Sequence, residues 1–191
     1  MAFLNKEELM QVGFKYIGHN VKVSDKAAIY NPEEIKIGDN SRIDDFCVIS
    51  GRVEIGRNVH ITINCNVAGG IPGVYIGDFS TIAYACHIMS QSDDYSGMTM
   101  TNSTVPKHYK NEIFKPVHIG KHVIIGACSV ILPGCDVSDG CSIGAMSLVN
   151  KPTLPWGVYV GSPAIRIKER SKNLLNHFSE FMKNEKNDSI Q

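Results

Sequence analysis

The chain has 191 residues, with 19 Lys and Arg against 19 Asp and Glu, so its formal net charge at pH 7 is zero. Balanced charge without a basic stripe excludes an electrostatic nucleic-acid binder. No apolar run reaches the twenty or so residues of a membrane span, and residues 1–6 lack a signal-peptide pattern, so we expect a cytoplasmic protein without a membrane span.

Residues 1–20 are predicted to form a helical cap. The run Asn5-Lys-Glu-Glu8 is a capping box that opens a short helix through Met10, and Gly13 closes it. The predicted role of this helix is to cover the apolar end of the repeat that follows.

Aliphatic residues recur at every sixth position over most of residues 21–158. The anchors are Ile37, Ile43, Ile49, Ile55, Ile61 and Val67, then Ile76, Ile82 and Ile88, then Ile119, Ile125, Ile131, Val137, Ile143 and Val149. A period of six fits neither an α-helix nor a free strand and indicates a repeat architecture. We predict an all-β parallel β-helix in which three hexapeptides, each a strand and a corner, complete one triangular coil around the anchors.

A small or β-branched residue stands four places after most anchors and is predicted to fill the tight corner. These residues are Ser41, Cys47, Val53, Val59, Cys65, Ser80, Cys86, Val123, Ser129, Cys135, Cys141 and Ser147. Five of the six cysteines occupy this position, while Cys128 stands one place earlier, and there is no CxxC pair. We therefore predict free cysteines used as small apolar residues, with neither disulfides nor a metal site.

Two segments interrupt the period. The register slips by three across Gly69-Gly70-Ile71-Pro72-Gly73, which predicts a small corner bulge, and a longer excursion runs over residues 90–116. Such an excursion adds nothing to the axial core and is typical of a functional loop. Residues 159–191 are predicted to be a C-terminal extension, with a helix within Ile165–Lys183 that packs across a stack of coils.

With these repeats the chain resembles the hexapeptide-repeat acyltransferases over about residues 20–170. The resemblance implies a left-handed β-helix, although the general preference for right-handed crossovers argues the other way. Ser92-Asp-Asp-Tyr95 is similar to the Ser-His-Asp-Tyr run of galactoside- and polysaccharide-type acetyltransferases, whose His is the general base; here that position is Asp93. Gly161-Ser-Pro-Ala-Ile-Arg166 resembles the family's closing motif.

The missing His favours nitrogen over oxygen as the acceptor. A sugar hydroxyl needs a base with a pKa near neutrality, whereas a neutral sugar amine attacks a thioester unaided and only its proton must be collected. We therefore predict acetyl transfer from acetyl-CoA to an amino-deoxysugar, nucleotide-linked by resemblance, in surface-polysaccharide or O-antigen biosynthesis. Sugar O-acetylation remains the alternative.

The candidate catalytic residues lie around the excursion. Asp93 follows the strand of Ile88, His118 precedes the anchor Ile119, and the ends of the loop are expected to meet; His87 should lie above Asn66 on the coil beneath. The catalytic candidates are Asp93, His118 and His87, and the substrate-binding candidates are Asn64, Asn66, Asp94 and Tyr95. Asn64 is included because it resembles the family's acceptor-binding Asn. Each could instead be an ordinary surface or loop residue.

The resemblance also implies coenzyme A, held between subunits of a homotrimer. The matching positions for its pantetheine arm are Gly126, Ala127, Gly144 and Ala145, whose backbone amides would polarise the thioester. Lys151, Arg166 and Lys168 are the candidates for its phosphates.

Two other functions share this scaffold. A γ-class carbonic anhydrase would need three His ligands, for which His87, His118 and His122 are available, but the long loop and the closing motif argue against it. A non-catalytic scaffold would tolerate changes at Asp93 and His118. Asp44 and Asp45 are expected at the surface, and neither His60 nor His122 has a predicted partner.

Overall fold

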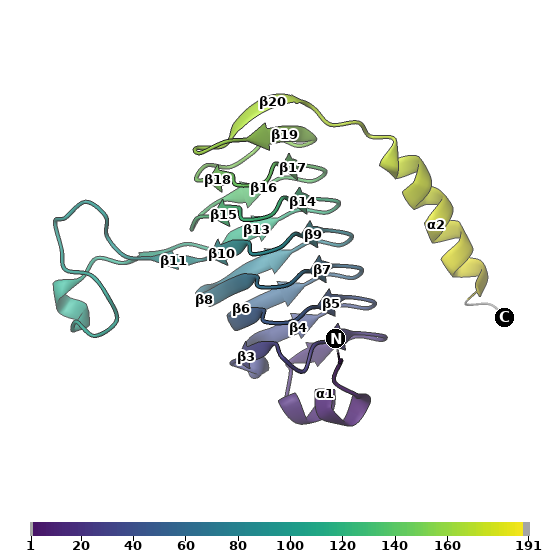
Figure 1. Ribbon diagram of the computed structural model, residues 1–191, viewed down its shortest axis with the longest axis horizontal. Helices are drawn as coiled ribbons and strands as arrows, with labels where there is room; N and C mark the ends of the chain where they lie inside the picture. Colours follow the sequence, from purple (N-terminus) through teal and green to yellow (C-terminus); the bar gives the residue numbers. More distant parts are fainter. Residues whose placement is uncertain (1, 189–191) are drawn as a thin grey trace.

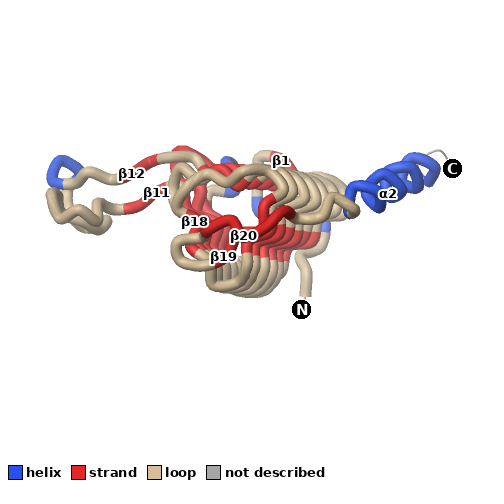
Figure 2. Tube along the Cα trace, turned by 90° about the horizontal axis from the view of Figure 1, so that it is seen from above, coloured by secondary structure: helices blue, strands red, loops and turns tan. Residues whose placement is uncertain are grey.

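The structure, a computed structural model, describes residues 2–188, with side chains through residue 185. Parallel coils stack into a column with α1 (Lys6–Val12) at one end and β19 (Gly157–Val160) and β20 (Ile165–Glu169) at the other (Figure 1). Seen along the stack, the loop carrying β11 (Gln91–Ser92) and β12 (Ile113–Phe114) projects on one side, and α2 (Leu174–Asp188) lies on the opposite side (Figure 2).

The coils present three faces. The first face comprises β1 (Tyr16–Ile17), β4 (Ile35–Ile37), the ends of β6 (Val48–Ile55) and β8 (Asn66–Ile76), β13 (Val117–Ile119) and β16 (Asp136–Val137). The second comprises β2 (Lys22–Val23), β5 (Arg42–Ile43), β7 (His60–Ile61), β9 (Thr81–Ile82), β14 (Ile124–Ile125), β17 (Ser142–Ile143) and β19. The third comprises β3 (Ala28–Tyr30), the starts of β6 and β8, β10 (His87–Met89), β15 (Val130–Ile131) and β18 (Leu148–Val149).

The core is the predicted axial column. All fifteen predicted anchors are buried, with at most 4% of any of them exposed, and the twelve predicted corner residues are buried as well. Burying one Ile or Val side chain stabilises the fold by roughly 1.5–3 kcal/mol, so the repeat itself supplies most of the cohesion. Cys128 is the exception among the cysteines: it lies exposed on the second corner, the turn between the second and third faces.

Corner serines and cysteines are interchangeable because both donate a hydrogen bond to the next coil. Ser129 Oγ donates to the Gly144 carbonyl at 3.0 Å, and Cys65 Sγ donates to the Ala83 carbonyl at 3.1 Å. Burial raises the pKa of the Cys135 thiol, so it stays protonated. The cysteines within the described residues are all free, as the repeat predicted.

The N-terminal end is closed as expected. Asn5 caps α1 in a capping box with Glu8, and Gly13 ends the helix at a left-handed φ of 82°. Leu4 and Leu9 pack against the buried core, so α1 and the segment before it shield the first coil from water.

Both interruptions of the repeat lie at the third corner, between the third and first faces. Against β6, β8 carries three extra residues around Gly69 to Gly73, with Gly51 paired to Gly70. Adding a Cβ to Gly51 would place it 2.5 Å from the Gly70 nitrogen, so this close approach requires glycine. In the larger excursion, β11 pairs antiparallel with β12, which confirms that the loop ends meet, and η2 (Lys107–Tyr109) is a single 3₁₀ turn. A second 3₁₀ turn, η1 (Pro32–Glu34), lies outside the excursion, between β3 and β4.

A strand that the sequence analysis did not predict precedes the C-terminal helix. Ile165–Glu169 forms β20, antiparallel to β19, and the helix starts only at Leu174. Arg170 follows the strand, and its Nη1 donates to the carbonyls of His122, Gly140 and Cys141 at 2.7–3.2 Å. These bonds end the strand by tying the chain to the first corner, the turn between the first and second faces. The predicted helix within Ile165–Lys183 is present from Leu174 onward, whereas the strand before it was not predicted.

Aromatic contacts hold α2 against the first corner, the turn between the first and second faces. Phe178 lies edge-on to Phe79 and His122, with ring centroids 5.0 and 4.8 Å apart, and His122 stacks on Phe79 at 5.5 Å. Arg57 and Glu185 form an ion pair beside them. The predicted packing of this helix on coils is confirmed, here on coils of its own chain.

Candidate active site

One outward-facing column on the third face is apolar except for a single polar pair. In register along the stack, it consists of Ala28, Val48, Asn66, His87, Val130 and Leu148. His87 lies directly above Asn66, as predicted from the repeat, and its side chain is exposed. Polar side chains inside an apolar stripe mark a place where a ligand or a partner subunit is recognised rather than merely covered.

The second corner lies beside this column and carries Asn64 and the four small residues proposed to face coenzyme A. Asn64 is exposed and has a left-handed φ of 64°. A Cβ on Gly126 would come within 2.4 Å of the Ala145 nitrogen, so Gly126 is needed for the coils to stack whether or not a ligand is bound. The side chains of Ala127 and Ala145 are single methyl groups, so they project little from the outer surface of the corner.

Two of the four backbone amides proposed for the thioester are already hydrogen-bonded. The N–H groups of Gly126 and Gly144 donate to the carbonyls of Ile143 and Tyr159, both at 2.8 Å, and are not free for a thioester. Among the described residues, the N–H groups of Tyr84, Ala127 and Ala145 have no hydrogen-bond partner. Available donors therefore exist at this corner, but they belong to the residues at the tip of the turn.

The two aspartates at the root of the loop have different surroundings. Asp94 accepts hydrogen bonds from the Ser96 amide at 2.8 Å and from the amide and hydroxyl of Thr99 at 3.2 and 2.7 Å, and those with Ser96, then Thr99, lower its pKa to about 2. Within the described residues the Asp93 carboxylate accepts a single hydrogen bond, at Oδ1 from the backbone amide of Asn102 at 3.2 Å. Asp94 is thus engaged in folding the loop, whereas Asp93 keeps an oxygen available. Tyr95 is 92% exposed and projects from the loop.

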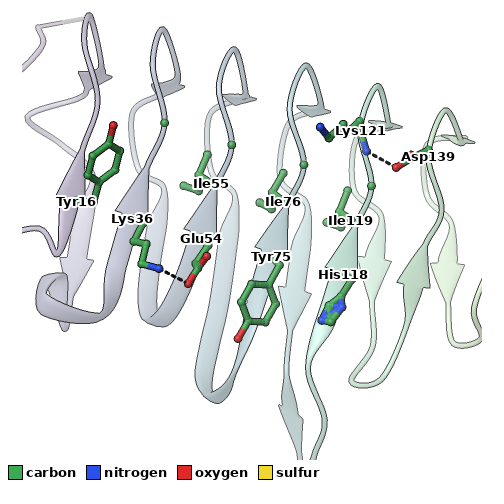
Figure 3. A pocket seen from close by; sticks show the side chains of 14 residues that line it. Tyr16, Lys36, Glu54, Ile55, Tyr75, Ile76, His118, Ile119, Lys121 and Asp139 are labelled. Carbon is green, nitrogen blue, oxygen red and sulfur yellow. Dashed lines mark hydrogen bonds and ion pairs between the residues drawn. The ribbon is translucent and has the colours of Figure 1, made fainter.

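His118 lies on a different surface. It borders a groove of about 490 Å³ on the first face, together with Tyr75 and the Lys36–Glu54 ion pair (Figure 3). The His118 and Tyr75 rings meet edge-on at 4.9 Å, and Asp136 Oδ1 lies 3.5 Å from His118 Nδ1. No hydrogen bond or ion pair among the described residues joins any two of Asp93, His87 and His118. Within one chain, the three predicted catalytic residues are thus not linked to one another by polar contacts.

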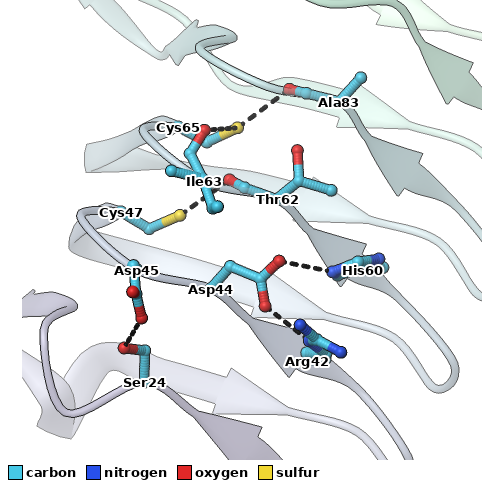
Figure 4. A network of polar contacts seen from close by, with 10 residues as sticks. All are labelled: Ser24, Arg42, Asp44, Asp45, Cys47, His60, Thr62, Ile63, Cys65 and Ala83. Atoms are coloured by element: carbon cyan, nitrogen blue, oxygen red, sulfur yellow. Dashed lines mark hydrogen bonds and ion pairs between the residues drawn. The ribbon is translucent and has the colours of Figure 1, made fainter. Parts of the chain in front are cut away.

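A buried carboxylate that sequence reasoning placed at the surface forms a second polar cluster. Asp44 is only 4% exposed, and it accepts from Arg42 Nε at 2.5 Å and from His60 Nε2 at 2.9 Å (Figure 4). The expectation that Asp44 is exposed was wrong, and the unpaired His60 has a partner. Arg42 and His60 stand eighteen positions apart, one coil length, so the repeat itself held the signal for this contact.

The three cations proposed for the phosphates of coenzyme A lie near the C-terminal end of the stack, and all are exposed. Arg166 and Lys168 are on β20, where Arg166 is paired with Glu169 at 2.7 Å. Lys151 follows β18. Lys151 and Lys168 make no ion pair among the described residues, so these two keep their charge available.

The histidines of the metalloenzyme alternative are dispersed. His87 lies on the third face, His118 on the first, and His122 among aromatic rings under α2. The described part of the chain holds no cluster of three or more side chains able to bind a metal. Nor does any helix in that part have the length and apolar character needed to cross a membrane.

Comparison with known proteins agrees with this architecture. The bacterial transferase hexapeptide (six repeats) family matches residues 34–69. The dTDP-4-amino-4,6-dideoxy-D-glucose acyltransferase of Escherichia coli is 44% identical over 184 residues, 95% of each chain. AntD, an N-acyltransferase from Bacillus cereus solved with dTDP and 3-hydroxybutyryl-CoA, is 41% identical, with a TM-score of 0.95 over 96% of this chain and 98% of that one. A variant of AntD was solved with dTDP-4-amino-4,6-dideoxyglucose and coenzyme A.

A maltose O-acetyltransferase from Clostridium difficile, 23% identical with a TM-score of 0.55 over 87% of this chain and 75% of that one, shares the fold alone. The E. coli and B. cereus proteins, in contrast, are 44% and 41% identical to this chain over nearly its full length. The chain belongs to the hexapeptide-repeat acyltransferases, in the same group as AntD and the E. coli acyltransferase.

Proposed function

We propose that this protein transfers an acyl group from acyl-CoA to the 4-amino group of a dTDP-linked 4-amino-4,6-dideoxyhexose. The observation that carries the proposal is the 44% identity over 95% of both chains to an E. coli enzyme named for that substrate. The aspartate at the position of the general-base His in O-acetyltransferases agrees with it, because an amine acceptor does not require an imidazole base.

In the proposed reaction, the neutral amine attacks the thioester carbonyl carbon and forms a C–N bond. The negative charge that develops on the carbonyl oxygen needs hydrogen-bond donors held in advance. The amides of Ala127 and Ala145, which have no partner among the described residues, are the proposed donors. Collapse of this intermediate breaks the C–S bond and releases the CoA thiolate. The nitrogen loses one proton, which must be collected by a nearby base and passed to the sulfur or to water.

We assign the proton-accepting role to Asp93 rather than Asp94. Asp93 has a carboxylate oxygen outside the loop's hydrogen bonds, whereas both oxygens of Asp94 accept from Ser96 or Thr99. His87 and Asn66 are proposed to contact the sugar from the third face, and Asn64 from the second corner. His118 is proposed to act from the first-face groove of a neighbouring subunit.

A site divided in this way requires more than one copy of the chain, and we propose a closed homotrimer. The apolar column around His87 and Asn66 needs a cover, and the loop exposes Tyr95 and Met98 at 92% and 85%. Large apolar side chains this exposed on a projecting loop are typical of a subunit contact. Each cleft would then combine the third face of one copy with the first face of the next.

Lys151 and Lys168 are proposed to meet the phosphates of coenzyme A, with Arg166 contributing if Glu169 releases it. The acetyl group, the cytoplasmic location and the surface-polysaccharide pathway expected from the sequence remain predictions.

Mass spectrometry of reaction products tests the function. Purified protein and acetyl-CoA are incubated in three parallel reactions, each with a different acceptor. The acceptors are dTDP-4-amino-4,6-dideoxyglucose, a UDP-linked 2-amino sugar and a dTDP sugar without an amine. The proposal expects an added acetyl group on the first compound only, in a linkage that resists hydroxylamine. An acetyl group cleaved by hydroxylamine would instead identify an ester and favour O-transfer.

A further inference from the structure

One column of the second corner changes size abruptly at Tyr84. The residues two places after successive anchors are Asp45, Ile63, Tyr84, Ala127 and Ala145. They lie over one another, because amides of successive coils bond to their carbonyls: Asn64 to Asp45, Ala85 to Ile63, Cys128 to Tyr84 and Met146 to Ala127, at 2.8–3.1 Å. Above Tyr84 the column holds only methyl side chains.

The methyl side chains of Ala127 and Ala145 leave a shallow surface at this corner, and the Tyr84 side chain projects at the end of it. This projection is called the ledge. The residue is 59% exposed, and its ring makes no hydrogen bond or aromatic contact within the described residues. A tyrosine that is mostly exposed in its own chain contributes little to the stability of the coil. Its bulk instead determines how far an extended ligand lying along Ala145 and Ala127 can reach toward the coil of Asn64.

This ledge lies where the transferred group must sit, an argument that rests on the proposed function. Coils stack at about 4.8 Å, so Ala127 and Asn64 lie roughly two coils, or about 10 Å, apart, with Tyr84 between them. If the thioester lies beside Ala127 and the sugar beside Asn64, their reacting atoms meet about 3 Å apart alongside the intermediate coil. The unpartnered N–H of Tyr84 lies on that same coil.

We infer that Tyr84 is the residue that selects the acyl group by length. Its ring admits the two-carbon acetyl group and blocks the additional carbons of a butyryl or 3-hydroxybutyryl chain. Removing the ring extends the shallow surface of Ala127 and Ala145 toward Asn64 and lets longer acyl chains lie alongside the coil. The relative AntD, solved with 3-hydroxybutyryl-CoA, shows that this architecture accommodates such a chain.

Competition between acyl donors tests the inference. The ratio of kcat/KM for butyryl-CoA to that for acetyl-CoA is measured with a saturating amino sugar for wild type, Tyr84→Ala and Tyr84→Phe. One methylene in an apolar pocket changes selectivity by about 10–200-fold. We therefore expect the ratio to rise at least tenfold in Tyr84→Ala and to stay within threefold in Tyr84→Phe. Phe46→Ala, which removes another exposed aromatic ring at the same corner, should leave the ratio unchanged.

The outcomes separate this inference from the function beneath it. Wild-type turnover of acetyl-CoA with an unchanged ratio in Tyr84→Ala would overturn the role of Tyr84 and leave the acyltransferase assignment intact. Wild type that already prefers butyryl-CoA would overturn the inference in the same way. Absence of turnover with every acyl donor would refute the proposed function, and the inference with it.

Discussion

Asp44 holds His60 through a hydrogen bond of 2.9 Å between Oδ2 and Nε2, and the same buried carboxylate binds Arg42 through its other oxygen. Replacing the carboxylate by an amide, in Asp44→Asn, keeps the shape but removes the charge that both partners face. Because Arg42 and His60 are each about 40% exposed, water can partly replace the lost contact. We expect a loss of about 1–3 kcal/mol in the free energy of unfolding, measured in urea.

The matched control for this variant is Asp45→Asn, on the neighbouring residue. Asp45 accepts from Ser24 Oγ at 2.5 Å and lies 3.6 Å from Lys26, the one residue of the described range with which it forms an ion pair. A smaller loss is expected there. Equal urea midpoints for wild type and Asp44→Asn would show that the buried cluster contributes nothing to stability.

Docking of α2 should weaken as the pH falls, because His122 must stay neutral between aromatic rings. Burial lowers the pKa of His122 below its ordinary value of 6.5. The unfolded chain then binds more protons than the folded one in this range, so stability rises with pH. The contribution is complete above pH of about 6.5 and is lost as the pH falls through the lower, folded pKa.

Hydrogen exchange of the α2 amides between pH 5 and 7.5 measures this effect, after correction for the intrinsic pH dependence of exchange. Asp78, Asp139, Lys121 and Arg170 also act on His122, and the aspartates oppose the shift. His122→Phe should remove the pH dependence of protection, whereas His177→Gln, an exposed residue at the same helix, should preserve it. Identical profiles in wild type and His122→Phe would assign the dependence to another group.

The axial column should be the least tolerant part of the molecule. Ile125 is fully buried in the middle of the stack. Ile125→Val removes one methylene and should cost about 0.5–1.5 kcal/mol, whereas Ile125→Asp buries an unpaired charge and should prevent folding. Circular dichroism and urea unfolding measure both. Ile124→Asp is the control, since the adjacent side chain points outward and is 39% exposed; a native spectrum is expected for it.

The coils were predictable because burial enforces the six-residue period at every turn. Each anchor and each corner residue occupies a position that only an aliphatic or a small side chain can fill, so sequence and geometry carry the same information. The strand Ile165–Glu169 was not predicted, although Ile165 and Ile167 alternate as in a strand. It forms by pairing with β19, and the helix begins at Leu174, where the helical spacing begins.

Contacts between side chains on different coils were harder to predict. His87 above Asn66 follows from counting hexapeptides, and the same count would have brought His60 over Arg42. The environment of His122 could not be found in this way, since Phe178 arrives from a segment outside the repeat whose path is set by Arg170. The repeat also does not reveal which backbone amides bond to the next coil: of the four proposed donors, those of Gly126 and Gly144 are bonded and those of Ala127 and Ala145 are not.

Substitutions of Asp93 and Asp94 should affect different kinetic constants. Asp93→Asn retains an oxygen that can accept from the Asn102 amide but removes the proton acceptor, so we expect kcat to fall more than tenfold with the melting temperature unchanged. Asp94→Asn weakens the hydrogen bonds from Ser96 and Thr99 that shape the loop, and should mainly raise KM for the sugar. Steady-state kinetics with dTDP-4-amino-4,6-dideoxyglucose, measured beside His87→Ala and His118→Ala, distinguish the roles. Wild-type kcat in Asp93→Asn, together with a large loss in His87→Ala, would transfer the proton-accepting role to the histidine on the third face.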